Sequence, residues 1–296
     1  MNILKIINFL QALKNKKLIL FFLLISKIIF SANLFDFATL LYNENDYYRA
    51  ISEFQRFIFY FPNDKKVDDA YLYIVKSYYF GKQYKNVIES SIEYKQKINN
   101  QIIKEKLLFY LANGYLFNNN YKESYNLFKE IAQTSVSTNL REISQFRLYW
   151  VYIFQMKWKE ALNEILNFEK NNTSKKFNTK LELLKKDLEK GINFKGLSPT
   201  LAALLSAVLP GAGQVYTKRI GDGLVALTFI SIITYGTYYY YKNGPKEISF
   251  ALGILDLIFY AGNIYTAFSS ANKYNKNFNI KLKDELFNNY FEDYDL

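Results

Sequence analysis

Residues 46–50 read Asp-Tyr-Tyr-Arg-Ala, and three later segments follow the same pattern: Gln-Tyr-Lys-Asn-Val at 83–87, Asn-Tyr-Lys-Glu-Ser at 120–124 and Lys-Trp-Lys-Glu-Ala at 157–161. Their last residues fall at equal intervals of 37 residues, at positions 50, 87, 124 and 161. An interval of this length accommodates a helix, a turn and a second helix. The spacing therefore predicts an internal helical repeat.

The stretches on either side of these segments carry helical patterns. Each segment follows an aromatic-rich stretch and precedes an amphipathic one, as in Ala50, Phe54 and Phe57, which are spaced i, i+4, i+7. A further helix is predicted over residues 179–190, where three leucines share one stripe. We therefore expect residues 33–195 to form four units of 37 residues and a closing helix.

This segment resembles the tetratricopeptide repeat family, in which pairs of antiparallel helices stack into a right-handed solenoid. In the first unit Ala38 and Ala50 stand where small residues let the helices touch, and Pro62 ends the second helix. The second and fourth units carry Val75 and Tyr149 at such positions, so wider helix spacing is expected there. The 37-residue period is similar to that of the envelope branch of the family. The resemblance implies an all-α fold.

In that family the first helix of every unit lines a concave groove, which binds a peptide or helix of a partner protein. The resemblance places the following candidates for partner binding on or near the groove: Tyr79, Phe80, Asn113, Phe117, Phe146, Trp150 and Phe154, with Thr39, Tyr42 and Lys76 beside them. The alternative interpretation, that some of these rings are inter-repeat core, carries equal weight.

The amino-acid composition excludes several common kinds of catalytic and metal-binding site. The chain has no His and no Cys, which excludes an imidazole base, a thiolate nucleophile, a disulfide and a Cys/His zinc site. The formal charge is +11, but the basic residues of the repeats are scattered singly, so no nucleic-acid groove is predicted. We therefore predict neither an enzyme nor a cofactor or metal site.

The N-terminus has the pattern of an export signal. The first 17 positions contain four lysines and no acidic residue, an apolar stretch interrupted by Ser26 and Lys27 runs from 18 to 30, and Ser31 and Ala32 follow. Residues 1–32 are therefore expected to form a secretory signal peptide. The alternative is an uncleaved signal anchor, and either would export the segment that follows.

A membrane domain is predicted over residues 196–270, because no charged residue occurs from Leu197 through Thr217 and two longer apolar stretches follow. The expected spans lie near 198–216, 223–241 and 248–268. The first is either a crossing or a segment that dips in and returns, so the domain has two to three spans. We favour a crossing.

The sharpest motif in this domain is Leu-Pro-Gly-Ala-Gly-Gln-Val-Tyr at 209–216. It resembles a group of small bacterial membrane domains of uncharacterised function with a Pro-Gly-x-Gly-Gln-x-Tyr signature, and more distantly the paired-transmembrane-helix domain family. It is not a phosphate loop, because no Gly-Lys-Ser/Thr follows. The candidate residues of the membrane domain are Pro210, Gly211, Gly213, Gln214, Tyr216, Gly221, Asp256 and Asn263.

Asp256 stands near the centre of the last predicted span, where a charged carboxylate costs about 2.5–3.5 kcal/mol on insertion scales. Ser249, Gly253, Tyr260 and Asn263 share its helical face. One hypothesis is a proton or ion path. The hypothesis that we favour is an interhelical contact.

Three crossings after an exported repeat domain would leave residues 271–296 as a cytoplasmic tail. Of the basic residues that flank the spans, six would then lie on the cytoplasmic side and two on the opposite side, which is the expected bias. The acidic end at 292–296 is expected to be solvated rather than a short ligand. The predicted function is that of a bacterial inner-membrane scaffold with periplasmic repeats, in envelope assembly or protein traffic. The alternative is a small transporter or channel component with regulatory repeats. Expected partners are a protein and membrane lipid, and homo-oligomerisation through the spans is left open.

Overall fold

The computed structural model describes residue 31 and residues 33–171 and 178–296, in which every regular element is a helix. The all-α fold class is thus confirmed for this part of the chain. The expected leader over 1–32 lies outside the described residues apart from Ser31. Backbone contacts divide the described residues into two compact units: the first holds residues 31, 33–155, 163–171 and 293–296, and the second holds 156–162 and 178–292.

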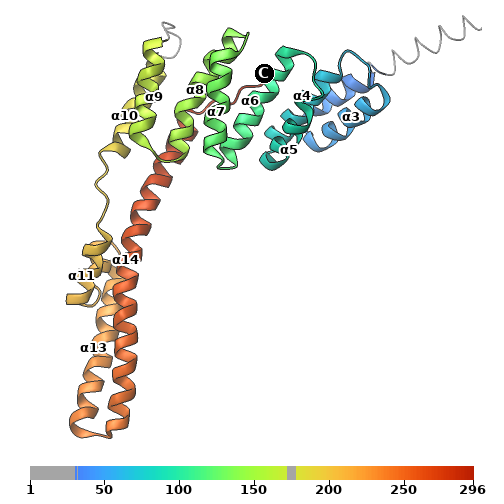
Figure 1. Ribbon diagram of the computed structural model, residues 1–296. Helices are drawn as coiled ribbons and strands as arrows, with labels where there is room; N and C mark the ends of the chain where they lie inside the picture. Colours follow the sequence, from blue (N-terminus) through green and yellow to red (C-terminus); the bar gives the residue numbers. More distant parts are fainter. Residues whose placement is uncertain (1–30, 32, 172–177) are drawn as a thin grey trace, which may run out of the picture. The chain divides into compact units, whose positions relative to one another are not determined.

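The first unit is a row of helical hairpins (Figure 1). After a helical segment over residues 33–43 come α3 (Tyr47–Tyr60), α4 (Val67–Phe80), α5 (Tyr84–Tyr94), α6 (Gln101–Phe117), α7 (Tyr121–Thr134) and α8 (Thr138–Phe154). From α3 to α8 each helix packs against the next, and α6 also packs against α4 and α8. The first helices of successive pairs are therefore direct neighbours.

The turns of this unit repeat in geometry as well as in sequence. Helices α3, α5, α7 and α9 (Trp158–Asn171) begin at intervals of 37 residues, and each follows a turn with a left-handed residue: Asn45, Lys82, Asn119 and Met156, with φ between 57° and 63°. In the first turn Asn45 N–H donates to Tyr42 O and Asp46 N–H to Leu41 O, the two bonds of a Schellman motif. The predicted period is confirmed.

The predicted amphipathic faces form the core of this unit. Ala50, Phe54 and Phe57 are fully buried, and both rings meet the edge of Phe35 at about 5.5 Å and 5.3 Å between centroids. A Cβ placed on Gly114 would come within 2.8 Å of Val87 Cγ1, so a small residue is required where α5 and α6 touch.

The second unit contains α10 (Asn178–Ile192), α11 (Pro199–Val208), α12 (Ala212–Tyr216), α13 (Ile220–Asn243) and α14 (Lys246–Tyr290). Helices α13 and α14 form a long hairpin, and α10, α11 and α12 pack on α14. The helix predicted over 179–190 is present as α10. The sequence boundary at 271 is not an element boundary, because α14 continues to Tyr290.

Helices α13 and α14 are long and apolar enough to cross a membrane, and the apolar window of each is only 11% buried. Their apolar side chains therefore face outward along most of the hairpin, as lipid-facing helices do. This supports membrane association of the second unit.

Residues 198–216, where we expected a crossing, form two short helices instead. Helix α11 has ten residues, and Leu209 and Pro210 follow it before α12 begins. The Ser198 N–H donates to the Tyr216 hydroxyl at 3.1 Å, so both ends of the segment lie together. The ends of a crossing would lie about 30 Å apart. The expectation of a full span is therefore wrong, and the segment turns back on itself.

Candidate functional site

The tail segment, Asp293–Leu296, lies in the first unit against the first helices of the hairpins. Its contacts in the described part of the chain include those of five side chains, which we call the groove residues: Tyr42, Lys76, Tyr79, Tyr110 and Arg147. They come from the helical segment over 33–43 and from α4, α6 and α8. The groove residues are thus distributed over four successive hairpins.

Two buried cations of the groove face two carboxylates of the tail segment. Lys76 and Arg147 are 5% and 1% exposed with the tail segment in place. Lys76 pairs with Asp295 and donates to Leu296 O at 3.0 Å, and Arg147 lies 3.8 Å from Asp293. A buried cation without a counter-ion is costly. The groove therefore favours an acidic ligand.

Three tyrosines add directional hydrogen bonds. Tyr42 donates to Asp295 at 3.1 Å, Tyr79 donates to Asp293, and Tyr110 donates to Tyr294 O at 3.0 Å while accepting from Leu296 N–H at 3.0 Å. Burial raises the pKa of Tyr42, Tyr79 and Tyr110, so these phenols keep their protons and remain donors.

Aromatic and apolar contacts complete the site. The guanidinium of Arg147 lies over the Tyr294 ring at 5.2 Å, and Leu296 packs against the core of the first unit. A cation over an aromatic face is attracted by the ring quadrupole. The tail segment is therefore held by charge, hydrogen bonds and apolar contact together.

Among the seven groove candidates, Tyr79 donates a hydrogen bond to Asp293 of the tail segment. Asn113, Phe146 and Trp150 are buried, and Phe80, Phe117 and Phe154 are half-buried. Phe117 stacks on Tyr84 at 4.7 Å and meets the edge of Phe154 at 5.4 Å. These two contacts join neighbouring pairs, so the core interpretation describes the rings better.

Sequence reasoning missed Tyr110 and Arg147, although a signal for both existed. Tyr73, Tyr110 and Arg147 stand 37 residues apart, so they occupy one position of successive first helices. Lys76 follows Tyr73 at i+3 and Tyr79 follows Lys76 at i+3, so each side chain neighbours the next on the helix surface. The register was readable, but it carries Tyr, Tyr and then Arg rather than an aromatic residue in every unit.

The expectation of a solvated acidic end is wrong, because its last four residues are bound. A chain with its repeats and its tail segment on opposite sides of a membrane cannot form these contacts. Within the second unit, Leu197 exchanges hydrogen bonds of 2.8 Å and 2.9 Å with Asn275 of α14, which places the segment before α11 beside the end of the hairpin. Both findings disagree with the expected three-span order.

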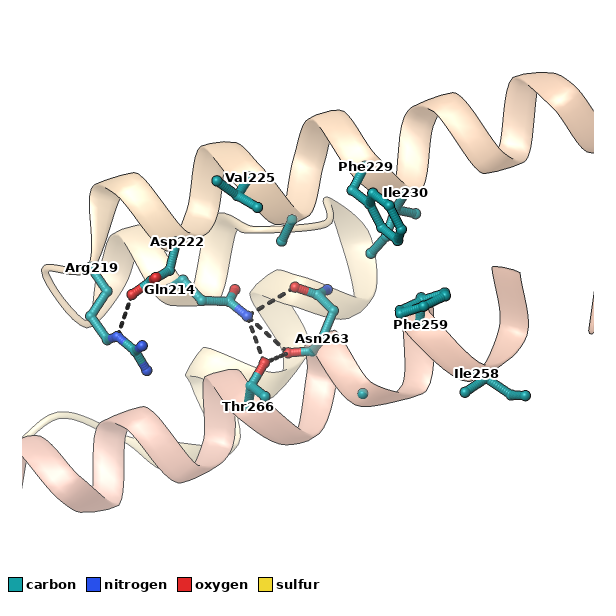
Figure 2. A pocket seen from close by; sticks show the side chains of 12 residues that line it. Gln214, Arg219, Asp222, Val225, Phe229, Ile230, Ile258, Phe259, Asn263 and Thr266 are labelled. Carbon is teal, nitrogen blue, oxygen red and sulfur yellow. Dashed lines mark hydrogen bonds and ion pairs between the residues drawn. The ribbon is translucent and has the colours of Figure 1, made fainter. Parts of the chain in front are cut away.

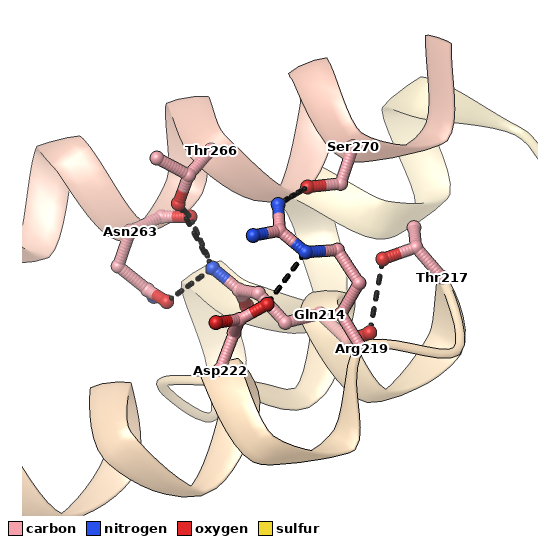
Figure 3. A network of polar contacts seen from close by, with 7 residues as sticks. All are labelled: Gln214, Thr217, Arg219, Asp222, Asn263, Thr266 and Ser270. Carbon is pink, nitrogen blue, oxygen red and sulfur yellow. Dashed lines mark hydrogen bonds and ion pairs between the residues drawn. The ribbon is translucent and has the colours of Figure 1, made fainter. Parts of the chain in front are cut away.

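In the second unit, Gln214 of the glycine motif and Asn263 of α14 meet in a polar network (Figure 3). Gln214 Nε2 donates to Asn263 O, Asn263 Oδ1 and Thr266 Oγ1 at 3.0, 2.9 and 2.9 Å, and its Oε1 accepts from Ser206 at 2.9 Å. The Gly211 N–H donates to Asn263 Oδ1 at 3.2 Å. Gln214 and Asn263 thus join α11, α12 and α14.

Two glycines of the motif permit close backbone approach. Gly211 has φ 86°, and a Cβ there would come 2.0 Å from Gly223 O. A Cβ on Gly213 would come 2.0 Å from Ala202 O. Pro210 lies between α11 and this turn, and the Tyr216 hydroxyl accepts a hydrogen bond from the Ser198 N–H at the start of α11. Gly221 differs from the two motif glycines, because a Cβ there would meet no atom within 4 Å.

Asp256 lies on a face of α14 that contacts neighbouring helices. Its Oδ2 accepts from Thr234 at 2.8 Å, Ser249 donates to Thr237 O at 2.9 Å, and Tyr260 donates to Ala207 O at 2.9 Å. The polar stripe therefore consists of interhelical contacts, which favours the structural role for Asp256.

A cavity of about 540 Å³ opens between α13 and α14 next to this network (Figure 2). Its polar end holds Arg219, Asp222 and Thr266, and its apolar end holds Phe229 and Phe259. We call it the hairpin cavity. No group of three or more His, Cys, Asp or Glu side chains that could hold a metal ion occurs in the part of the chain described here.

Comparison with known proteins gives no match: no family model, curated protein or solved structure is significantly similar to this chain.

Proposed function

We propose that this protein is a membrane-anchored scaffold whose tetratricopeptide-like repeats bind short acidic, aromatic segments of partner proteins. The observation that carries the proposal is the tail segment seated on the groove residues, with Lys76 and Arg147 facing Asp295 and Asp293. A partner segment with a similar spacing of carboxylates would use the same contacts. The tail segment then acts as a resident ligand that a partner displaces.

The hairpin of α13 and α14 is the proposed anchor. Two crossings return the chain to the side from which it entered, which is compatible with a tail segment bound to the repeats. The leader pattern implies export, and the first apolar segment usually dominates orientation. We therefore keep the repeats in the periplasm of a bacterial envelope, with a role in envelope assembly or protein traffic.

The flanking cations favour the opposite orientation. Lys218, Arg219 and four lysines after residue 270 would lie on the side of the repeats, against Lys242 and Lys246 at the far end of the hairpin. Cytoplasmic repeats are therefore the alternative outcome of a topology experiment. The binding proposal holds in either compartment.

A transporter or channel component remains the second candidate function, supported by the carboxylate of Asp256 within α14. Asp256 Oδ1 has no hydrogen-bond partner among the described residues. The contact between Asp256 and Thr234 favours the scaffold.

The binding proposal is tested with a labelled peptide of residues 290–296 and the full chain carrying a scrambled tail segment. We expect saturable binding that Lys76→Gln and Arg147→Gln each weaken. Lys95→Gln and Lys129→Gln, which remove exposed cations elsewhere on the repeats, should leave the affinity unchanged. Equal losses in both pairs would show non-specific attraction of the acidic peptide and refute the proposal.

A further inference from the structure

The hairpin cavity has a polar neighbour. A second cavity of about 250 Å³ is lined by Thr217, Ser270, Lys273, Tyr274 and Asn277. Arg219 lines this cavity and the hairpin cavity alike. One guanidinium therefore lies where an apolar cavity and a hydroxyl-rich cationic cavity meet.

The guanidinium of Arg219 is held in place by two hydrogen bonds and has further N–H donors. Its Nε donates to Asp222 at 2.6 Å and its Nη1 donates to Ser270 at 2.8 Å. A guanidinium has five N–H groups, so three remain for a ligand in addition to these bonds. A planar array of N–H donors suits a phosphate, which accepts two bonds from it.

The local charge is complementary to an anion. Lys273 lines the second cavity with Arg219, and Lys218 lies beside it with its Nζ 3.2 Å from the Tyr274 hydroxyl. Asp222 is the opposing carboxylate in this group. The formal charge of these four residues is positive, as in basic pockets between membrane helices that hold anionic headgroups.

The position along the hairpin fits a lipid. Arg219 and Lys273 flank the apolar stretches, which is the level of the headgroups. Phe229 stands ten residues after Arg219, which corresponds to about 15 Å at 1.5 Å per residue. This depth is half of a hydrocarbon core of about 30 Å. An acyl chain could follow the hairpin cavity from Arg219 to the rings of Phe229 and Phe259, which meet edge to face at 4.9 Å.

We propose that the two cavities form a binding site for one anionic phospholipid, with the phosphate at Arg219 and Lys273 and one acyl chain in the hairpin cavity. The inference rests on the insertion of α13 and α14 that the proposed function includes. Anionic lipid would then hold the α12–α13 turn against α14, which is where the Gln214 network lies.

The test measures lipid binding by native mass spectrometry of the full chain in detergent, with phosphatidylglycerol and phosphatidylcholine as probes. We expect phosphatidylglycerol to bind more tightly. A basic residue near an anionic lipid contributes about 1 kcal/mol, which corresponds to about fivefold in affinity. Arg219→Gln with Lys273→Gln should thus weaken binding about 25-fold. Lys242→Gln with Lys246→Gln, at the other end of the hairpin, is the matched control and should bind as the native chain does.

A second pair of variants tests the apolar part. Ala226→Trp fills the hairpin cavity and should reduce binding, whereas Ala251→Trp adds the same ring to the exposed face of α14 and should not. Helix content by circular dichroism must stay unchanged in both. Equal binding of the two lipids, equal losses in both cation pairs, or competition by inorganic phosphate alone would overturn the proposal. Release of the chain from membranes at alkaline pH would instead refute the anchor.

Discussion

The double substitution Asp293→Asn and Asp295→Asn removes the charges that the tail segment offers to the groove while keeping side-chain size and hydrogen-bonding oxygens. A hydrogen bond to a charged group contributes roughly 1.5–3 kcal/mol when buried. Both aspartates are about half exposed, at 50% and 55%, so solvent screening reduces this to about 1 kcal/mol each. The docking equilibrium of the tail segment should fall about 30-fold for the pair.

The assay is fluorescence anisotropy of a labelled peptide of residues 290–296 added to the full chain. A docked tail segment raises the apparent Kd of the peptide, which equals the intrinsic Kd divided by the fraction of chains whose groove is empty. Weaker docking should therefore let the peptide bind up to about 30-fold more tightly to the double variant than to the native chain. Asp36→Asn with Asp284→Asn, two aspartates whose ion pairs lie outside the groove, is the matched control. An unchanged apparent affinity in the double variant would refute the intramolecular competition.

Three further predictions address other parts of the chain. Asp256→Asn should leave the thermal unfolding temperature and the amount of protein in the membrane nearly unchanged. Asp256→Leu should lower the unfolding temperature, because it leaves the Thr234 hydroxyl without its acceptor. Loss of function in the Asn variant at a normal protein level would support the ion-path hypothesis instead. Burial and the charge of Glu93 raise the pKa of Tyr94 to about 12 from about 10. The stability that the neutral phenol contributes is therefore complete below pH 10 and is lost as the pH rises to 12. Tyr94→Phe should flatten the dependence of the urea-unfolding free energy on pH in this window, and an unaltered dependence would contradict the prediction. Lys95→Cys and Asn243→Cys in this Cys-free chain should react with an impermeant maleimide from opposite sides of the membrane, and labelling from the same side would exclude two crossings.

The repeat was readable from the sequence because it is local. The turn residues at 45, 82 and 119 are fixed by hydrogen bonds that span five residues or fewer, so their chemistry recurs at the 37-residue spacing. The amphipathic faces around Phe54 and Phe128 were readable because their apolar residues recur at short spacings within one helix. Both residues are fully buried in the structure.

The bound tail segment was not readable because its contacts are remote. Tyr42 and Asp295 are 253 residues apart, and no periodicity links a four-residue segment to a groove built from four hairpins. Aromatic abundance is also ambiguous, because Trp150 and Phe146 occupy the positions that line the groove in the family but are buried core residues in this chain. The cations Lys76 and Arg147 were the stronger signal, because a buried cation requires a counter-ion.

The sequence did not decide whether residues 198–216 cross the membrane or turn back, because composition does not distinguish a crossing from a re-entrant turn. Its apolar length suits either. The bond from Ser198 to Tyr216 decides it, and that bond joins residues whose types have no special spacing. The glycine motif did locate the turn, since Gly211 and Gly213 stand where the backbones approach most closely.

The most direct test of the bound tail segment is a photo-crosslink from position 294 in intact membranes. Tyr294 is replaced by benzoylphenylalanine, the cells are irradiated, and the crosslinked residues are mapped by mass spectrometry. Because Tyr294 lies over Arg147 and its carbonyl accepts from Tyr110, we predict an intramolecular crosslink to α6 or α8 that an excess of the 290–296 peptide suppresses. Crosslinks confined to lipid or to other proteins, with none to α6 or α8, would contradict the docking of the tail segment on the repeats.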